Sequence, residues 1–450
     1  MEQTRVMKTL CHAASRGKIL PVFLTLITIL FLSTFPGSVL WAGYPDSAFY
    51  STANDRIFWF IHITDPHIGT SGNDDTDNLQ WIVTEARTAI NPSFIVNSGD
   101  LTDSTDGDDP IPYGGPYIEE WEEYYGILDA AGIDADFYYD IPGNHDHYND
   151  KDFVYYLANS IQGIATGQTQ ISWRRDFTFG KYHFIGVCTA GNDGASFLAP
   201  PNFGDHAGLD EYELSYIETE LENNTDADLT IIFGHHPILS TGNPDETSLT
   251  YGAAAFIDLM ESYGVSMYAF GHTHRYEEDF LSGDTSDGIL YLNVGALGKS
   301  DENQYNVTAI DCNGISTVAV NVKTWPVVLI TAPVDRNLGT DDSPYAYSID
   351  DLNPKPIRAL VFDVNPATRV RFRIDETGDW HTMTQVTGNS YLWEALFDNA
   401  STLSEEDHTL EVQATGSSTR SDIIVIGGNV SNDSSGESGG GGCFISTTGH

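Results

Sequence analysis

Basic residues are scarce in this 450-residue sequence, in which 20 Lys and Arg stand against 65 Asp and Glu. Only seven of the basic residues are lysines, and the formal net charge is −45. A chain this negative repels phosphate backbones and anionic lipids, which argues against nucleic-acid binding and against polybasic attachment to membranes. The scarcity of lysine fits a salt-tolerant exported protein. With 40% hydrophobic and 12% aromatic residues, the chain can build folded cores, which argues against a disordered acidic chain.

Cysteine is also scarce. Of the four cysteines, three follow the first apolar run, at Cys188, Cys312 and Cys443. An odd number without close spacing excludes a disulfide framework and a cysteine zinc site. The sequence leaves open either one bridge between Cys188 and Cys312 or two buried free thiols.

Long apolar runs are absent after residue 42. The apolar run 19–32 follows four basic residues. It precedes a candidate cleavage site, Leu40-Trp41-Ala42, which ends in a small residue. This is the plan of a secretory signal peptide, so we predict a signal peptide over 1–42 and export to the periplasm or the extracellular medium. An uncleaved membrane anchor over 19–42 is the alternative. Because no later stretch reaches about 18 apolar residues, the mature chain is predicted to have no transmembrane span.

Residues 43–324 are predicted to form one α/β domain, in which short apolar runs alternate with amphipathic stretches. The runs predicted as strands are 57–64, 94–97, 137–141, 171–179, 182–187, 229–233, 266–270, 289–294, 305–311 and 315–322. The stretches predicted as helices are 79–90, 117–131, 209–222 and 253–263. A βαβ beginning that turns into hairpins indicates a layered α/β (α+β) sandwich with mixed sheets.

The character of the sequence changes at Thr324-Trp325-Pro326. Residues 325–427 contain short alternating apolar runs between turn residues, at 327–330, 357–362, 370–374, 391–396, 409–414 and 423–426. Six or more strands in about 100 residues are typical of an all-β immunoglobulin-like sandwich. Residues 428–450 begin as a Gly/Ser-rich stretch, and we predict a flexible tail there.

Five of the strands predicted in the first domain are followed by residues of the types that bind metals. These residues are Asp65 and His67 after 57–64, Asp100 after 94–97, Asn144, His145 and Asp146 after 137–141, His235 after 229–233, and His272 and His274 after 266–270. Strand ends in open α/β sheets are where sites assemble, because their loops converge on one crevice. We therefore expect five chain-distant segments to deliver these side chains to one place.

The chemistry of this set is specific. Carboxylate, amide oxygen and imidazole together suit divalent metals such as Mn, Fe, Co or Zn. The lack of thiolates excludes a closed structural zinc site, and the imidazoles are too many for a calcium or magnesium cage. About seven ligands exceed what one ion needs, and one carboxylate can bridge two ions. Two metals roughly 3.5–4 Å apart suit in-line displacement at phosphorus, so the set predicts two divalent ions and a phosphoester substrate.

The sequence resembles the calcineurin-like metallophosphoesterases. It contains their full signature, in the family's order and within residues 58–295: Asp65-x-His67, Gly99-Asp100-x-x-Asp103, Gly143-Asn144-His145-Asp146, Gly234-His235-x-Pro237 and Gly271-His272-x-His274. The resemblance implies a four-layer metallophosphoesterase sandwich. Residues 325–331 and the part of the chain that they begin resemble the Ig-like module of transmembrane-protein-type metallophosphoesterases. Those relatives continue into membrane spans, and we carry over no function of their membrane part.

The resemblance also implies roles for individual residues. One metal would be held by Asp65, His67, Asp100 and His274, and the second by Asp100, Asn144, His235 and His272, with Asp100 as the bridge. His145 would contact the phosphate and stabilise the transition state or protonate the leaving oxygen. Asp146, which we group with His145 as catalytic, and Asp103 would orient neighbouring groups.

We interpret the sequence as that of an exported dinuclear-metal phosphoesterase that hydrolyses a phosphodiester through a hydroxide bridging the metals. The Gly-Asn-His-Asp motif favours diesters, since an added acid matters most for a poor alkoxide leaving group. The expected substrate is a small-molecule or surface-linked phosphoester, and the Ig-like domain is expected to contact a protein or a cell surface. Two alternatives stay open: a phosphomonoesterase on the same site, or a non-catalytic adhesion or scaffold protein whose metal site only stiffens the fold.

Overall fold

The computed structural model describes most of the chain between residues 56 and 427. The described residues are 56–70, 74–104, 114–191, 207–239, 248–281, 288–300, 302–338, 341–342, 355–397, 403 and 406–427. The predicted signal peptide and the predicted tail lie outside these residues, as does Cys443.

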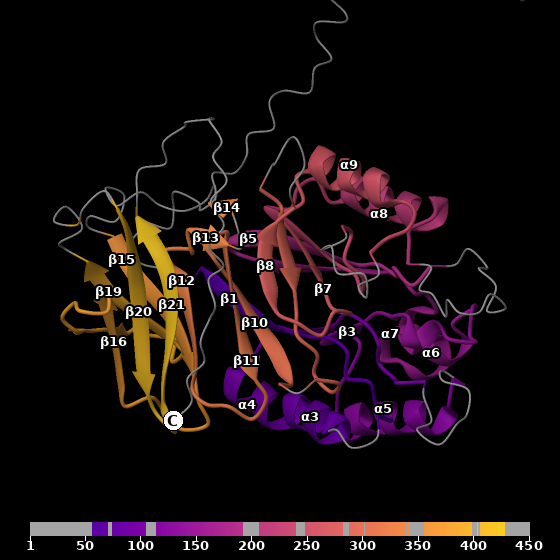
Figure 1. Ribbon diagram of the computed structural model, residues 1–450, viewed down its shortest axis with the longest axis horizontal. Helices are drawn as coiled ribbons and strands as arrows, with labels where there is room; N and C mark the ends of the chain where they lie inside the picture. Colours follow the sequence, from indigo (N-terminus) through magenta and orange to yellow (C-terminus); the bar gives the residue numbers. More distant parts are fainter. Residues whose placement is uncertain are drawn as a thin grey trace, which may run out of the picture. The chain divides into compact units, whose positions relative to one another are not determined.

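The first sheet has the strand order β11-β10-β1-β2-β3 and is mixed (Figure 1). Its strands are β1 (Ile57–Ile63), β2 (Ile95–Asn97), β3 (Tyr138–Asp140), β10 (Gln304–Asp311) and β11 (Gly314–Asn321). Strands β1, β2 and β3 run parallel, whereas β10 and β11 are antiparallel to their neighbours. The carboxyl ends of three strands therefore open at one edge of this sheet, which is where sites form in α/β folds.

The second sheet has the order β4-β5-β6-β7-β9-β8 and is also mixed. Its strands are β4 (Ile171–Phe177), β5 (Gly180–Gly186), β6 (Leu229–Phe233), β7 (Met267–Phe270), β8 (Glu277–Phe280) and β9 (Leu290–Asn293). Strands β5, β6, β7 and β9 are parallel, and the edge strands β4 and β8 are antiparallel to their neighbours. The charged residues of the edge strand β8 discourage pairing with another chain.

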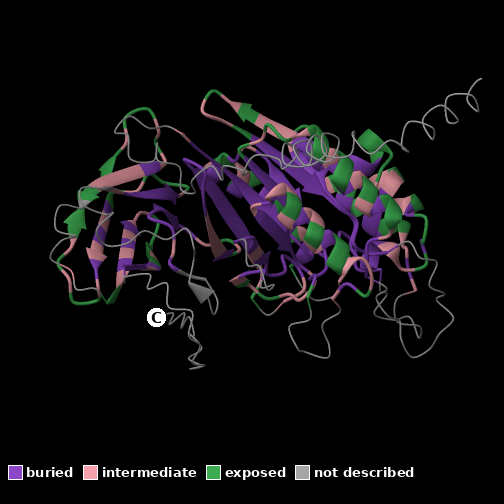
Figure 2. Cartoon of the chain, turned by 90° about the horizontal axis from the view of Figure 1, so that it is seen from above, coloured by how far each residue is buried: buried purple, intermediate pink, exposed green. Residues whose placement is uncertain are grey.

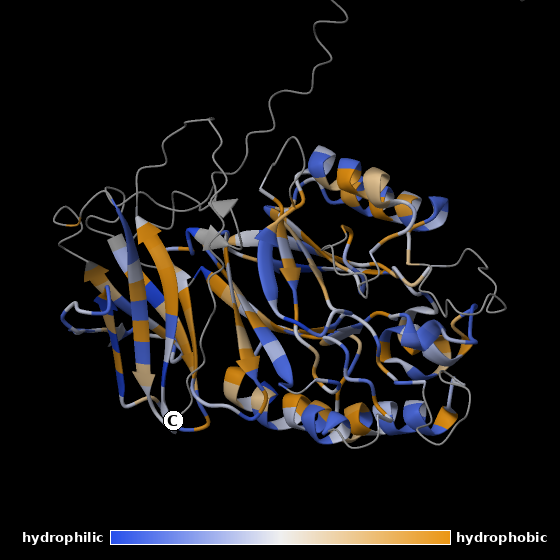
Figure 3. Ribbon diagram, in the orientation of Figure 1, coloured by the Kyte–Doolittle hydropathy of each residue, from blue (hydrophilic) through white to orange (hydrophobic). Residues whose placement is uncertain are grey.

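Alternating side chains of β1 join the two sheets and the helices into layers. Trp59 and Ile61 belong to the core under helices α3 (Asp75–Trp81) and α5 (Ile118–Ala130), whereas Phe60 lies 6.0 Å from the rings of Phe184 and Phe233 in the second sheet. Helices α8 (Glu211–Asn223) and α9 (Ala253–Tyr263) cover the other face of the second sheet. Figure 2 shows buried strands and helices with exposed outer faces, and Figure 3 shows the matching mixture of hydrophobic and hydrophilic residues on the helices. The predicted layered α/β fold is thus confirmed.

Several local elements differ from the prediction. The helix expected over 79–90 begins earlier, and it is made of α3, a π-helical turn η2 (Ile82–Ala86) and α4 (Arg87–Ile90). Two short helices were not predicted, α6 (Val154–Asn159) and α7 (Ile161–Thr166), because each is too short to show a helical period. Cys188 and Cys312 are buried free thiols, which settles the choice that the sequence left open between them.

The second part of the chain is all-β, as predicted. One antiparallel sheet has the order β12-β15-β19-β18 and the other the order β17-β16-β20-β21. Their strands are β12 (Val327–Ala332), β15 (Lys355–Phe362), β16 (Arg369–Ile374), β17 (His381–Thr382), β18 (Thr384–Gln385), β19 (Leu392–Phe397), β20 (Asp407–Thr415) and β21 (Thr419–Gly427). A small sheet pairs β13 (Asn337–Leu338) with β14 (Asp341–Asp342). The immunoglobulin-like identity of this part stays a prediction.

Strands β12 and β15 of the sheet β12-β15-β19-β18 are buried on both faces. Val327 and Leu329 belong to the same core as Trp59 of the first sheet, whereas Val328 and Ile330 belong to the core between the two sheets of the sandwich. The Trp59 ring also lies 5.4 Å from the ring of Phe362 in β15. An unbroken apolar strand such as β12 is typical of this two-sided burial. One hydrophobic core therefore crosses the domain boundary predicted at residue 324.

A buried ion pair reinforces this junction. The Asp311 carboxylate at the end of β10 accepts two hydrogen bonds from the Arg358 guanidinium of β15, at 2.8 and 3.1 Å. The same carboxylate accepts a hydrogen bond of 2.7 Å from the Thr331 hydroxyl, and Arg358 also lies 3.3 Å from Glu394. Arg358 and Asp311 are 1% and 0% exposed, so the pair is fully removed from water. Each charge depends on the other, because a buried charge without a partner is strongly destabilising.

Candidate metal centre

The structure brings all seven predicted metal ligands to the carboxyl ends of five strands. Asp65 and His67 follow β1, Asp100 follows β2, Asn144 follows β3, His235 follows β6, and His272 and His274 follow β7. The first three of these strands belong to one sheet and the other two to the second sheet. The site therefore lies where the open ends of both sheets meet.

One half of the site is built around the Asp65 carboxylate. Its Oδ1 atom lies 3.6 Å from His67 Nε2 and 3.4 Å from His274 Nε2, and those two nitrogens are 3.2 Å apart. The other oxygen, Oδ2, accepts hydrogen bonds from the Thr64 hydroxyl and from the backbone N–H of His272. One oxygen is thus fixed by the protein, while the other faces the imidazoles.

The other half is built around the Asn144 amide. Its Oδ1 atom lies 3.0 Å from His235 Nε2 and 3.0 Å from His272 Nδ1. The amide nitrogen donates a hydrogen bond of 2.7 Å to the Tyr148 hydroxyl. This bond holds the amide so that its oxygen points toward the two imidazoles.

Asp100 lies between the two halves. Its Oδ2 atom is 3.5 Å from His67 Nε2 and 3.2 Å from His235 Nε2, so one oxygen faces a histidine of each half. Its Oδ1 atom accepts a hydrogen bond from the backbone N–H of His145 at 2.8 Å. A Cβ atom on Gly143 would collide with this carboxylate, which explains the glycine at that position. The placement matches that of a bridging carboxylate.

Five of the seven residues have a left-handed backbone. The φ angles are 50° at Asp65, 48° at His67, 51° at Asp100, 69° at His272 and 58° at His274. For residues other than glycine this conformation costs on the order of 1–3 kcal/mol and clusters at functional sites. The three segments that follow β1, β2 and β7 are therefore held in a strained form that aims their side chains at a common centre.

Acceptors lie outside the Nδ1 atoms of two of the predicted histidine ligands. His235 Nδ1 lies 3.1 Å from the Ser98 carbonyl oxygen, and His67 Nδ1 lies 3.0 Å from Asp103 Oδ1. The His235 contact needs a proton on Nδ1, which leaves its Nε2 lone pair directed inward, and the Asp103 carboxylate beside His67 Nδ1 favours the same form of that ring. This arrangement is usual around histidines that bind metals.

The charges of the site stabilise one another. Burial would raise the pKa of the Asp65 carboxyl, but His235 and His274 outweigh it and hold that pKa well below its usual range. Burial likewise opposes ionisation of Asp100, and His235 and His145 hold its pKa well below the usual range. For His235 itself, burial would lower the pKa, but Asp100 and Asp65 raise it to about 9. Without an ion, this histidine would balance the two carboxylates by holding a second proton.

The two predicted catalytic residues are placed differently. His145 lies beside the centre, with its Nε2 3.9 Å from Asp100 Oδ2, and burial lowers its pKa to about 3 although Asp100 opposes the shift. Asp146 instead accepts hydrogen bonds from the backbone N–H groups of Leu101, Thr102 and Gly143. Burial and the nearby Asp100 raise the pKa of Asp146 to about 7, against these donors. Asp146 thus ties the Asp100 loop to the loop that carries Asn144 and His145.

The donor set fits divalent metal ions. Asp65 Oδ1 is buried and has no hydrogen-bond partner, although three imidazole nitrogens surround it at 3.4–3.9 Å. Candidate ligand atoms lie within 4.8 Å of one another in the group Asp65, His67 and His274 and in the group Asp65, Asp100 and His235. A cation coordinated by these atoms would satisfy the unpartnered oxygen and use the inward lone pairs.

Sequence reasoning missed two side chains near the centre. His236 was not among the predicted ligands, yet its ring lies 4.5 Å from that of His272, and it groups with His235 and His272 as a candidate ligand set. Lys299 was not singled out, and its Nζ atom lies 2.6 Å from Asp103 Oδ1. No local signal could have found Lys299, because its partner is 196 residues away. His62 is buried, and its Nε2 atom is hydrogen-bonded to the Ser98 hydroxyl.

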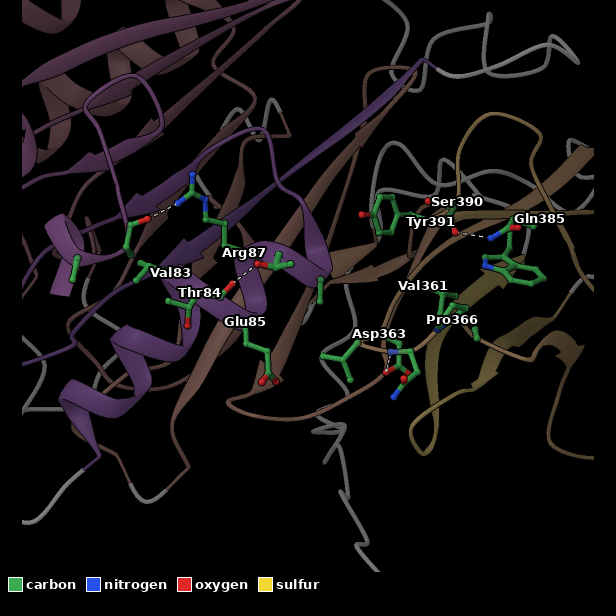
Figure 4. Close-up of a pocket in the computed structure, with 18 residues that line it drawn as sticks. Val83, Thr84, Glu85, Arg87, Val361, Asp363, Pro366, Gln385, Ser390 and Tyr391 are labelled. Carbon is green, nitrogen blue, oxygen red and sulfur yellow. Dashed lines mark hydrogen bonds between the residues drawn. The ribbon is translucent and has the colours of Figure 1, made fainter.

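A groove of about 990 Å³ lies elsewhere in the molecule, and none of the seven predicted ligands lines it. Figure 4 shows Val83, Thr84 and Arg87 of the first helical segment on one side, with Val361 and Tyr391 of the sandwich on the other. The cavity thus belongs to the junction between the two parts of the chain.

Comparisons with known proteins match the stretch of the chain that contains these residues. A family model described as calcineurin-like phosphoesterase matches residues 58–276. Transmembrane protein 62 of Mus musculus is 28% identical over 391 residues, which cover 84% of this chain and 56% of that protein. A protein of Arabidopsis thaliana that bears the name of a metallophosphoesterase is 24% identical over 375 residues, covering 72% of this chain and 49% of that protein. The chain therefore spans about half the length of these curated relatives.

Among solved structures, a dimetal phosphatase of Danio rerio aligns with a TM-score of 0.43 and 14% identity, over 60% of this chain and 100% of that one. Within the part of the chain that the structure describes, we find no helix with the length and apolar content that a membrane crossing requires.

Proposed function

Since the chain belongs to the calcineurin-like phosphoesterase family through residues 58–276, we propose that it is an exported enzyme that hydrolyses a phosphodiester with the help of two divalent metal ions. At the level of the family, the comparisons confirm the prediction of a phosphoric ester hydrolase. The observation that carries the proposal is the position of Asp100, whose Oδ2 faces a histidine of each half of the site.

The two halves of the site would each hold one ion. We assign Asp65, His67 and His274 to one ion and Asn144, His235 and His272 to the other, with Asp100 shared. When bound, two ions of the Mn, Fe, Co or Zn type would supply positive charge to the phosphoryl oxygens and a water acidic enough to act as nucleophile. The protein would place these ligands by strained loops and orient their imidazoles from outside.

His145 would act on the leaving group. Its Nδ1 lies 2.5 Å from the Asp103 carbonyl oxygen, so the proton of the neutral ring resides there and Nε2 faces the centre. A phosphoryl anion beside Nε2 would favour the protonated ring, because an opposite charge stabilises the charged form. The added proton would then lie on Nε2, within reach of a leaving alkoxide. Alkyl alkoxides are poor leaving groups, which supports a diester as the substrate.

The remaining assignments follow the sequence. We propose that residues 43–324 carry catalysis, that residues 325–427 form an Ig-like domain facing a protein or cell surface, and that residues 428–450 form a tail. The signal-like pattern of residues 1–42 supports export. The excess of acidic residues supports a partner that is not a nucleic acid.

The proposal is tested with the full chain on bis(p-nitrophenyl) phosphate and on p-nitrophenyl phosphate. Each assay is run after chelation and after return of Mn²⁺, with Asp100→Asn as the test variant and Asp152→Asn, an exposed aspartate beside Lys151, as the matched control. We expect diester cleavage that disappears on chelation, returns with Mn²⁺, and is lost only in Asp100→Asn.

Other outcomes have definite meanings. Faster cleavage of the monoester would identify a phosphomonoesterase on the same site. Two bound Mn²⁺ ions per chain without turnover of either compound would support a metal-stabilised scaffold protein and would contradict the enzymatic proposal.

A further inference from the structure

Lys299 is held against the loop that carries Asp65 and His67. The backbone N–H of Leu297 donates to the Thr64 carbonyl oxygen at 2.9 Å, and that of Gly298 donates to the Asp65 carbonyl oxygen at 3.1 Å. A Cβ atom on Gly298 would collide with the Pro66 carbonyl oxygen, so the two segments lie in direct contact. The backbone at Lys299 is therefore fixed relative to two of the predicted metal ligands.

The Lys299 side chain ends on Asp103, which contacts a histidine on each side. Asp103 Oδ1 lies 2.6 Å from Lys299 Nζ and 3.0 Å from His67 Nδ1. The backbone carbonyl oxygen of the same residue accepts a hydrogen bond from His145 Nδ1. The same residue thus places a carboxylate beside Nδ1 of a predicted metal ligand and a hydrogen-bonded carbonyl oxygen on Nδ1 of the predicted substrate-facing histidine.

The ion pair between Lys299 and Asp103 is not an ordinary surface pair. The Asp103 side chain is 3% exposed and that of Lys299 is 31% exposed, so the carboxylate end is removed from water. Exposed pairs contribute little because water screens them, whereas a buried carboxylate depends on its partners for compensation. Of the contacts to Asp103 Oδ1 described above, the one to the ammonium group is the shortest, and it comes from a full positive charge.

We propose that Lys299 is a positioning residue for the metal centre: it holds the Asp103 carboxylate, and through Asp103 it keeps His67 and His145 in the form that carries the proton on Nδ1. The proposal rests on the function proposed above and adds to it a residue outside the family signature. Outer partners of metal-binding histidines fix ring orientation and basicity, and their loss typically costs about 10–100-fold in metal affinity or activity. Lys299 acts one contact further out, so we expect an effect at the lower end of this range.

The first test reads the histidines directly, without metal or substrate. Nitrogen-15 spectra of the chelated full chain at pH 8 distinguish the two neutral forms of each imidazole. We compare the wild-type protein with Lys299→Met, which keeps the length of the side chain but removes its charge, and with Lys299→Arg, which keeps a cation. Lys181→Met serves as the control, because Lys181 forms an exposed pair with Asp226. We expect a mixture of forms at His67 in Lys299→Met alone.

The second test measures Mn²⁺ affinity by competition with a chelator, together with kcat and KM for bis(p-nitrophenyl) phosphate. We expect Lys299→Met to bind Mn²⁺ about tenfold more weakly and, at saturating Mn²⁺, to lose about tenfold in kcat with KM changed by less than about twofold. Lys299→Arg should recover most of both values, and Lys181→Met should match the wild type.

Each result decides a separate question. Unchanged histidine spectra and unchanged Mn²⁺ affinity in a folded Lys299→Met protein would overturn the proposal and leave Lys299 as a rim ion pair. If Lys299→Met does not fold, Lys299→Gln is used for the same two measurements. If the wild-type protein neither binds Mn²⁺ nor cleaves the diester, the proposed function fails, while the spectra of the chelated proteins still decide the role of Lys299.

Discussion

Two buried clusters of charged side chains lie at the two ends of strand β1, and they are built in opposite ways. Beside Ile57, at its beginning, the Asp311 carboxylate is paired with two N–H groups of Arg358 and with a hydroxyl group. After its end, Asp65 Oδ1 faces three imidazoles and has no hydrogen-bond partner. The first cluster is complete without anything from solution, whereas a bound cation would complete the second. Complete pairing marks a structural cluster, and incomplete pairing on a strained backbone marks a functional one.

The largest effect that this comparison predicts is on activity. Asp100→Asn removes the shared carboxylate, so we expect kcat/KM for the diester to fall by at least about 10⁴-fold, or about 5 kcal/mol of transition-state stabilisation. The free energy of unfolding of the chelated variant should fall only slightly, because the imidazoles that face Asp100 can release a proton when its charge is removed. Steady-state kinetics and urea unfolding measure the two quantities. A chelated variant several kcal/mol less stable than the wild type would make Asp100 a structural residue and break the comparison.

At the beginning of β1 we expect the reverse, a large loss of stability without a loss of metal affinity. Asp311→Asn leaves the Arg358 guanidinium buried without its main counter-charge and with only the partly exposed Glu394 as a carboxylate partner, so the free energy of unfolding should fall by about 3 kcal/mol. Mn²⁺ affinity, measured in the fraction that stays folded, should be unchanged. The double variant Asp311→Leu with Arg358→Met is the control, because replacing both charges by apolar groups is often neutral. Equal losses in the single and double variants would show that the charge pairing itself contributes little.

Removing the metal should destabilise the protein by a smaller amount. An ion that binds only the folded chain stabilises it by about 2.7 kcal/mol when its free concentration is 100 times its dissociation constant. Thermal unfolding of the wild type with Mn²⁺ and with excess chelator measures the difference. This difference between the two conditions should be small in Asp100→Asn, and in Asp311→Asn it should be as large as in the wild type. A wild-type protein with the same unfolding temperature in both conditions would contradict a metal-completed site.

The smallest effect is on the pH dependence of stability. It concerns a third cluster, which consists of the acidic groups Glu278, Asp335 and Asp422. Burial, followed by the effects of nearby Asp335 and Asp422, raises the pKa of Glu278 to about 8, although a hydrogen bond from Tyr276 opposes the shift. Burial also raises the pKa of Asp422 to about 7. Because these folded-state pKa values lie above the unfolded ones, the stabilising contribution is complete below about pH 4 and declines as the pH rises toward 8.

The chelated wild type should therefore lose on the order of 1 kcal/mol relative to Glu278→Gln between pH 5 and pH 8. Urea unfolding of both proteins at pH 5, 6.5 and 8 measures this difference. Parallel curves for the two proteins would show that Glu278 is ionised in the fold throughout this range.

The sequence predicted which side chains come together in the candidate site, because strand ends carry these residues in fixed local patterns. The apolar runs before Asp65, Asp100 and His235 marked the strands, and the ligand types marked the chemistry. What it could not predict were contacts between segments far apart in the chain. Lys299 meets Asp103 only because residues 297–298 bond to the end of β1. The unpartnered oxygen of Asp65 is likewise a property of the assembled site.

For the fold, too, the sequence predicted what depends on local patterns and missed what depends on the position of a segment in the assembled molecule. Long periodic segments such as α9 and β6 were predicted to the residue, whereas β8, whose sequence is Glu277-Glu278-Asp279-Phe280, resembles a loop because its position at a sheet edge permits charges. The apolar run that became β12 predicted a strand, but only the structure shows that its two faces serve two different cores.

The contact of Trp59 with Phe362 and Tyr391 has a consequence for how such proteins diverge. All three rings are packed together, with centroids 5.4 Å apart between Trp59 and each of the other two. A change of volume at one ring leaves a void or a clash unless another ring changes with it, since interiors are close-packed. Sequences descended from a common ancestor should therefore show correlated substitutions between β1 and the β15–β19 sheet, so that the two halves of the chain are inherited as one piece.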